Sequence, residues 1–208
     1  PVRRGHVVSR PAGTGIAQAQ SADPDFLKRV MKNKLFGQSA QDMMVQWQDP
    51  AHEQSVPDDI AAAGVTPGDE TFANLQWNMK AIDAAGAWAL GYDGAGVRVA
   101  VIDGGICKNH IDLKDNIDVA ASRSFVSGFN FDDDTGGPNA FRHACHVAGI
   151  IAAEDNGIGT VGVAPRATII ALKALHGGSG SFGAVIQAIL YAATPLAQGG
   201  GGADIINM

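Results

Sequence analysis

The sequence predicts an α/β fold with a doubly wound, mainly parallel sheet in its C-terminal two thirds. Apolar stretches without polar alternation recur at 97–102, 167–175 and 203–208, as expected for strands that are covered on both faces. Helical patterns rich in alanine lie between the strands, at 143–153 and 181–196. This strand–helix–strand order with short connections is typical of a three-layer sheet with helices on both faces.

Composition indicates one sizeable domain with an N-terminal extension. The chain has 208 residues, of which 46% are apolar. The first forty residues carry seven Lys/Arg and two Asp/Glu, whereas the remainder carries eight Lys/Arg and nineteen Asp/Glu. We therefore predict an extension over residues 1–70 and a compact domain over 71–208. The acidic body argues against a nucleic-acid partner, and no run of eighteen apolar residues predicts a membrane span.

The extension is predicted to be partly disordered. Residues 1–22 are rich in Gly, Ala, Ser and Gln without any periodicity, which is typical of a disordered segment or linker. Asp23 followed by Pro24 predicts a helix start, and apolar residues then recur on one face as far as Leu35. This pattern predicts one amphipathic helix, and the proline-rich, acidic stretch at 48–70 predicts a linker.

Elements of the compact domain alternate in order from Thr71. A short helix is predicted at 79–90, and a glycine-rich turn then leads into the strand at 97–102. In the helix at 181–196, apolar residues recur at spacings of three and four, which indicates a buried face. The remaining predicted elements are a helix at 143–153 and strands at 124–131, 167–175 and 203–208.

A carboxylate and a histidine stand at the ends of two of these elements. Asp103 follows a buried strand directly, at the sheet edge where catalytic groups gather in open α/β folds. His143 opens an alanine-rich helix that can lie close to the sheet. A carboxylate that accepts a hydrogen bond from a histidine ring fixes its tautomer and stabilises the imidazolium form. The glycines after Asp103 do not continue into a Gly-x-Gly-x-x-Gly motif, so a dinucleotide site is excluded.

Four motifs follow one another along the domain. They are Val-Ala-Val-Ile-Asp-Gly-Gly-Ile at 99–106, His-Ile-Asp-Leu at 110–113, His-Ala-Cys-His-Val-Ala-Gly-Ile at 143–150 and Gly-Ile-Gly-Thr-Val-Gly-Val-Ala-Pro at 157–165. In this order they resemble the subtilisin family of serine proteases, from about Gln76 to Met208. The resemblance implies a subtilisin-like three-layer fold, incomplete in this chain, and a serine endopeptidase that acts on polypeptide substrates.

Residue by residue, Asp103 resembles the triad aspartate and His143 the triad histidine of that family. The family's serine segment, Gly-Thr-Ser-Met-Ala, has no counterpart in this sequence. We therefore expect this chain alone to be inactive, with the serine supplied by a further C-terminal portion, encoded downstream or present as a second chain. The sequence departs from the family at Ala144 and Cys145, where Gly-Thr is usual, and at Gly104, where a serine or threonine is usual.

The resemblance also implies a structural Ca²⁺ site. It would use side-chain oxygens and backbone carbonyls, a set of hard oxygen ligands that Ca²⁺ prefers. The side-chain ligands would be Asp112 and Asn156, and the carbonyl ligands would come from Glu154, Ile158 and Thr160.

A substrate-binding edge is implied by Gly178, Ser179 and Gly180, which resemble the family segment that pairs with extended substrate backbone. Addition of a peptide strand to a sheet edge provides affinity that tolerates many sequences. Members of the family it resembles are mostly secreted, so the resemblance further implies a secreted or cell-envelope location.

Two other functions stay open on the sequence. A catalytically inactive relative that only binds peptides is compatible with the altered residues around the histidine. A zinc-binding module is the second alternative, because thiolate and imidazole ligands suit zinc. The zinc ligands would be drawn from Cys107, His110, His143, Cys145 and His146.

The chain has two cysteines, and this number does not predict a disulfide framework.

Overall fold

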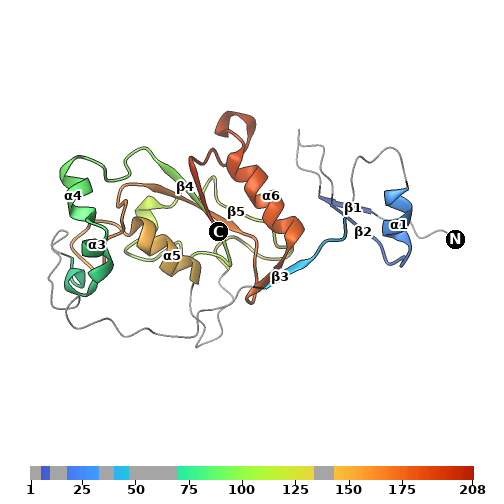
Figure 1. Cartoon of the computed structure of the whole chain (residues 1–208), viewed down its shortest axis with the longest axis horizontal. Coiled ribbons are helices and arrows are strands. Elements are labelled where there is room, and N and C mark those ends of the chain that lie inside the picture. The colour runs from blue at the N-terminus through green and yellow to red at the C-terminus, as the bar shows by residue number, and fades with distance from the viewer. Residues whose placement is uncertain (1–5, 10–17, 33–39, 47–69, 134–142) are drawn as a thin grey trace.

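The main body of the protein is a parallel sheet of four strands in the order β5–β6–β4–β8 (Figure 1). β4 and β6 pair in continuous register, from Arg98 opposite Thr168 to Asp103 opposite Lys173. The strands are β4 (Arg98–Asp103), β5 (Arg123–Ser124), β6 (Thr168–Lys173) and β8 (Ile205–Asn207). This computed structural model describes residues 6–9, 18–32, 40–46, 70–133 and 143–208.

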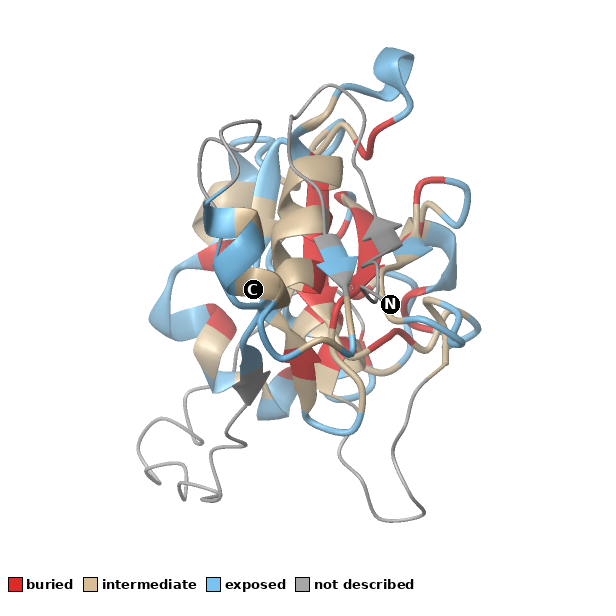
Figure 2. Cartoon of the chain, turned by 90° about the vertical axis from the view of Figure 1, so that its right-hand side faces the viewer, coloured by how far each residue is buried: buried red, intermediate tan, exposed pale blue. Residues whose placement is uncertain are grey.

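Helices cover both faces of the sheet, which makes three layers (Figure 2). Val99 and Val101 of β4 pack in one core with alanines of α5 (His143–Ala152). Ala100 and Ile102 face the opposite core with alanines of α6 (Phe182–Ala193). The side chains of Ala148 in α5 and Ala188 in α6 are fully buried, so both helices lie close to the strands. The predicted three-layer α/β class is confirmed.

Two predicted elements differ in length from those observed. The helix expected at 79–90 is divided into α3 (Trp77–Ala81) and α4 (Ala84–Ala89). Asp83 separates them because it adopts a left-handed conformation, with φ of 55°, and its carboxylate caps α4 at the N–H of Gly86. The strand expected at 124–131 ends early, because the Ser124 hydroxyl accepts a hydrogen bond from the Val126 N–H.

The N-terminal segment contains two short strands that the sequence did not predict. β1 (His6–Ser9) and β2 (Gln18–Gln20) pair antiparallel inside the stretch expected to lack regular structure. α1 (Phe26–Met31) lies within the predicted amphipathic helix. β3 (Met44–Gln46) then reaches the body and pairs with β7 (Ser179–Ser181), as Figure 1 shows. Most of the predicted linker, 48–69, lies outside the described residues.

Short 3-10 turns complete the described elements, and they connect the longer ones. None of the described helices is long and apolar enough to cross a lipid bilayer. The turns are η1 (Ala73–Leu75), η2 (Lys114–Asn116) and η3 (Leu196–Gln198).

Candidate active site

Asp103 and His143 meet at the edge of the sheet. Asp103 is the last residue of β4, and His143 is the first residue of α5. The distance from Asp103 Oδ2 to His143 Nδ1 is 2.6 Å, the length of a strong hydrogen bond between an imidazole and a carboxylate. Their side chains are 13% and 27% exposed, so the contact is shielded but open on one side. With Nδ1 held by the carboxylate, Nε2 is the ring atom suited to exchange protons with a substrate group.

The backbone around Asp103 is held by several hydrogen bonds. The Gly104 N–H donates to Asp103 Oδ1 at 2.5 Å, and the Ala174 N–H donates to the Asp103 carbonyl at 2.9 Å. The fully buried Lys173 ammonium donates to the Gly104 carbonyl from the neighbouring strand. Lys173 was not singled out from the sequence, although a lysine inside an otherwise apolar run is a signal for such a role. These contacts fix the direction of the carboxylate.

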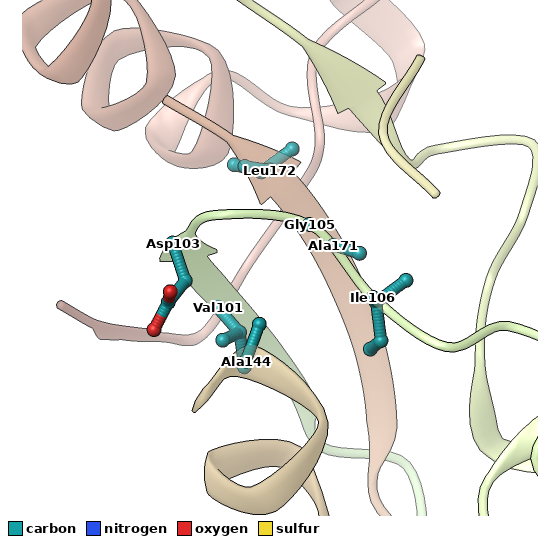
Figure 3. A pocket seen from close by; sticks show the side chains of 7 residues that line it. All are labelled: Val101, Asp103, Gly105, Ile106, Ala144, Ala171 and Leu172. Atoms are coloured by element: carbon teal, nitrogen blue, oxygen red, sulfur yellow. The ribbon is translucent and has the colours of Figure 1, made fainter. Parts of the chain in front are cut away.

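The start of α5 packs directly against β4. Figure 3 shows Ala144 next to Val101, with Asp103 at the strand end above them. These three residues line one small hollow, and Ala144 is buried. The alanine methyl that replaces the family's usual glycine therefore fills core space beside β4.

Cys107 and Cys145 form a disulfide, with their Cα atoms 5.7 Å apart. That separation is normal for a disulfide. The sequence did not predict this single bond, because residues 38 positions apart are brought together only by the packing of α5 on β4. The zinc-module alternative loses both thiolates to this bond. Among the described residues, no cluster of three or more His, Cys, Asp or Glu side chains could hold a metal.

The residues of the expected calcium loop also come together. Asp112 Oδ2 accepts hydrogen bonds from the N–H and hydroxyl of Thr160, at 3.0 and 3.2 Å. The Glu154 N–H donates to the Asp112 carbonyl at 2.9 Å. Asn156 Oδ1 accepts from the Ile158 N–H at 3.2 Å. All five predicted residues therefore belong to one compact loop cluster.

Glu70 belongs to the same cluster, and the sequence did not identify it. Its Oε1 accepts from the N–H groups of Asn156 and Gly157, at 2.8 and 2.9 Å. Burial raises the pKa of Glu70 above its ordinary value, and the charge of Asp112 raises it further. Within the described part of the chain, Glu70 Oε2 and Asp112 Oδ1 are both buried without a hydrogen-bond partner. Two such carboxylate oxygens are costly to bury unless a cation compensates them.

The expected substrate edge forms a tight hairpin after β6. Gly177 and Gly178 occupy its turn, with φ of 58° and 77°, a geometry that favours glycine. Ser179 and Gly180 then lie on β7. A side chain at Gly180 would meet the Ala174 carbonyl at 2.3 Å, so this strand runs close to the backbone that leaves β6.

β3 pairs antiparallel with this edge. Met44 lies opposite Ser181, and Gln46 lies opposite Ser179. Beyond the strand, the Phe182 N–H donates to the Met43 carbonyl at 2.6 Å. The Gly183 N–H donates to Asp42 Oδ1 at 2.8 Å. A segment of the N-terminal extension thus lies along the edge that the sequence assigns to substrate.

Comparisons with known proteins identify the family that the C-terminal part of the chain resembles. The model of the subtilase family of peptidases matches residues 94–208. The chain is 40% identical over 135 residues to Subtilisin DY of Bacillus licheniformis, which covers 64% of this chain and 44% of the relative. The chain is 39% identical over 128 residues to Minor extracellular protease Epr of Bacillus subtilis strain 168, and the matched region covers 60% of this chain and 18% of that protein. It is 40% identical over 125 residues to the Major intracellular serine protease of the same strain, covering 57% and 37%. The chain therefore spans less than half the length of these relatives.

Proposed function

This chain belongs to the subtilase family, and we propose that it supplies the aspartate and the histidine of an Asp–His–Ser triad that hydrolyses peptide bonds. The observation that carries the proposal is the 2.6 Å contact between Asp103 Oδ2 and His143 Nδ1 at the carboxyl edge of the sheet. Family membership comes from the match of the subtilase family model over residues 94–208. The relatives that are 39–40% identical, one of them named as a serine protease, support a protease function.

The chemistry follows from the orientation of the imidazole. His143 Nε2 takes the proton of a serine hydroxyl while the serine oxygen attacks the substrate carbonyl carbon. The resulting imidazolium is stabilised by the Asp103 carboxylate, and it then gives the proton to the leaving amine. Water hydrolyses the acyl-enzyme by the same route. We infer that the serine comes from a segment outside these 208 residues, as a continuation of the chain or as a second chain.

The substrate class is an extended polypeptide bound along β7. The antiparallel pairing of β3 with Ser179 and Gly180 supports this, since the edge presents backbone groups that already accept one extended strand. Substrate backbone would use the same donors and acceptors. Affinity that rests on main-chain hydrogen bonds would tolerate many substrate sequences.

The loop cluster around Asp112 fits a structural Ca²⁺ ion. Its oxygens belong to one carboxylate, one amide and several carbonyls, and the buried oxygens Asp112 Oδ1 and Glu70 Oε2 have no hydrogen-bond partner among the described residues. Asp112 and Asn156 would hold the ion by their side chains, with the carbonyls of Glu154, Ile158 and Thr160. Bound Ca²⁺ would supply the charge that offsets these buried carboxylates. Its role would be to stabilise the loop.

A secreted or cell-envelope location is the compartment we propose. The Cys107–Cys145 disulfide supports it, because disulfides persist in oxidising compartments. The relatives include proteins named as extracellular and proteins named as intracellular. Alkylation of free thiols in freshly lysed cells, followed by mass spectrometry, would show whether the bond forms in the native compartment.

A fluorophosphonate probe tests the proposed triad directly, because it modifies only an activated serine. The full-length natural protein should be labelled, and His143→Ala should abolish labelling without unfolding the protein. Equal labelling of both forms would refute the role of His143. A folded full-length protein that resists labelling would instead indicate an inactive relative that binds peptides.

A further inference from the structure

The disulfide lies next to the Asp–His contact along both segments of the chain. Cys107 follows Asp103 by four residues, and Cys145 follows His143 by two. The S–S bond therefore joins the loop that leaves β4 to the first turn of α5. The Cys107 N–H also donates a hydrogen bond to Cys145 Sγ at 2.9 Å. The disulfide and the Asp103–His143 contact therefore both connect the end of β4 and the loop after it with the start of α5.

The first turn of α5 is the part of this helix that most needs an anchor. The N–H groups of a first helical turn have no partners within the helix, so helix ends open more easily than helix centres. No acidic residue in this turn complements the helix dipole. Its buried side chain, Ala144, offers a single methyl group to the core. Catalytic groups, however, must be held to within about half an ångström of their working geometry.

We propose that the Cys107–Cys145 disulfide positions His143 against Asp103, and that reduction of this bond slows catalysis. The inference rests on the proposed protease function and adds a residue pair that acts through the histidine. Cys145 lies two residues after His143 in the same helical turn. Reduction would release Cys145 Sγ from Cys107, and the first turn of α5 would then be free to move relative to β4. The β7 edge is formed by other elements, so substrate binding should change little.

A reductant can reach this bond. Cys107 and Cys145 both line an open groove that Trp77 and Asn78 also line. Dithiothreitol would deliver two electrons and two protons, converting the S–S bond into two thiols, and would leave as its own cyclic disulfide.

The experiment uses the full-length protein and compares it with Cys107→Ser, Cys145→Ser and the double variant. Hydrolysis of a peptide substrate is measured with and without dithiothreitol, well below the unfolding temperature. In the parent protein, reduction should lower kcat by about 100-fold, the scale of a misplacement of about 1 Å, with KM changed less than about twofold. Each single variant should match the double variant, and dithiothreitol should have no further effect on any of the three.

A positioning role is separated from a purely structural role by proton NMR. The hydrogen bond from His143 Nδ1 to Asp103 should give a far-downfield resonance in the parent protein. This resonance should broaden or vanish on reduction while the amide spectrum of the sheet is retained. Loss of the amide dispersion as well would assign the bond to folding alone and overturn the proposal.

Other outcomes are equally decisive. Two free thiols in the unreduced native protein, or an unchanged kcat after complete reduction, would overturn the inference while leaving the protease function intact. If the serine variants do not fold, timed reduction of the folded parent protein gives the same comparison. Failure of the oxidised parent protein to hydrolyse peptides or to react with a fluorophosphonate would instead refute the proposed function.

Discussion

His143 Nδ1 lies 2.6 Å from Asp103 Oδ2, although forty residues separate the two along the chain. Each residue is terminal in its own element, one at the end of β4 and the other at the beginning of α5. Because α5 packs on β4 through buried alanines, the two ends meet at one edge of the sheet. The contact therefore results from the packing of α5 on β4, two elements that local sequence patterns predict.

Loss of the Asp103 carboxylate should lower kcat far more than it weakens substrate binding. Asp103→Asn in the full-length protein should lower kcat by roughly four orders of magnitude, because the amide favours the wrong imidazole tautomer and cannot stabilise the imidazolium. KM should change little. Steady-state kinetics with a peptide substrate checks this, and Asp25→Asn, at an exposed site in an N-terminal ion pair, is the matched control. Comparable rates for Asp103→Asn and the control would contradict the triad assignment.

Calcium should raise the thermal stability of the full-length protein. At a free concentration about 100-fold above Kd, the ion should add about 2.7 kcal/mol to the free energy of unfolding. Asp112→Asn should remove most of this gain, whereas Asp115→Asn should retain it, because the Asp115 carboxylate faces solvent beside Lys114. Calorimetry with Ca²⁺ and with a chelator measures the difference. A melting temperature that does not respond to Ca²⁺ would refute the site.

Weaker pairing of β3 should expose the β7 edge. Asp42→Ala removes the acceptor for the Gly183 N–H, a hydrogen bond worth about 1 kcal/mol. If substrate competes with β3, KM for a long peptide should fall by up to about fivefold, with kcat unchanged. Asp25→Ala serves as the control. The edge assignment fails if KM stays constant even after residues 1–46 are deleted.

Asp118 should stabilise the fold at neutral pH and lose this effect in acid. Burial favours the neutral acid, but hydrogen bonds from the Ala121 N–H and the Arg98 guanidinium outweigh it and lower the pKa below the usual 3.8. A lowered pKa in the folded state gives stability that is present at neutral pH and is lost as pH falls through that pKa.

Asp118→Asn should therefore unfold at lower urea concentration than the parent protein at pH about 7, and the difference should shrink towards pH about 3. Arg98 also donates to the carbonyls of Gly201 and Gly202, so the variant should loosen the segment that leads into β8. Urea titrations across this pH range provide the measurement. A pH-independent difference would mean that the carboxylate charge does not contribute.

Local patterns predicted the parts of this protein that depend on neighbouring residues. The unbroken apolar run before Asp103 predicts a strand that is covered on both faces, and the small residues after His143 predict a closely packed helix. Both elements were found within a residue or so of their predicted bounds. The division of the helix at Asp83 was missed, because a left-handed aspartate leaves no clear signature in apolar periodicity.

Three contacts between distant segments were not predicted from the sequence. Cys107 and Cys145 are 38 residues apart, and nothing in their spacing distinguishes a disulfide from two separate thiols. Glu70 reaches the Asp112 cluster across more than forty positions, and its role depends on burial that no local pattern reveals. The pairing of β3 with β7 is of the same kind, because a short extended segment can join any open edge.

The α/β class, the order of the main strands and helices after residue 97, and the positions of Asp103 and His143 at element ends all follow from local patterns, because periodicity and residue type act over a few neighbouring positions. The hydrogen bond between Asp103 and His143, the disulfide that joins their elements and the place of β3 along the β7 edge emerge only when the chain is folded. These relationships depend on how helices pack on a sheet, which is set by the whole core and not by any one segment.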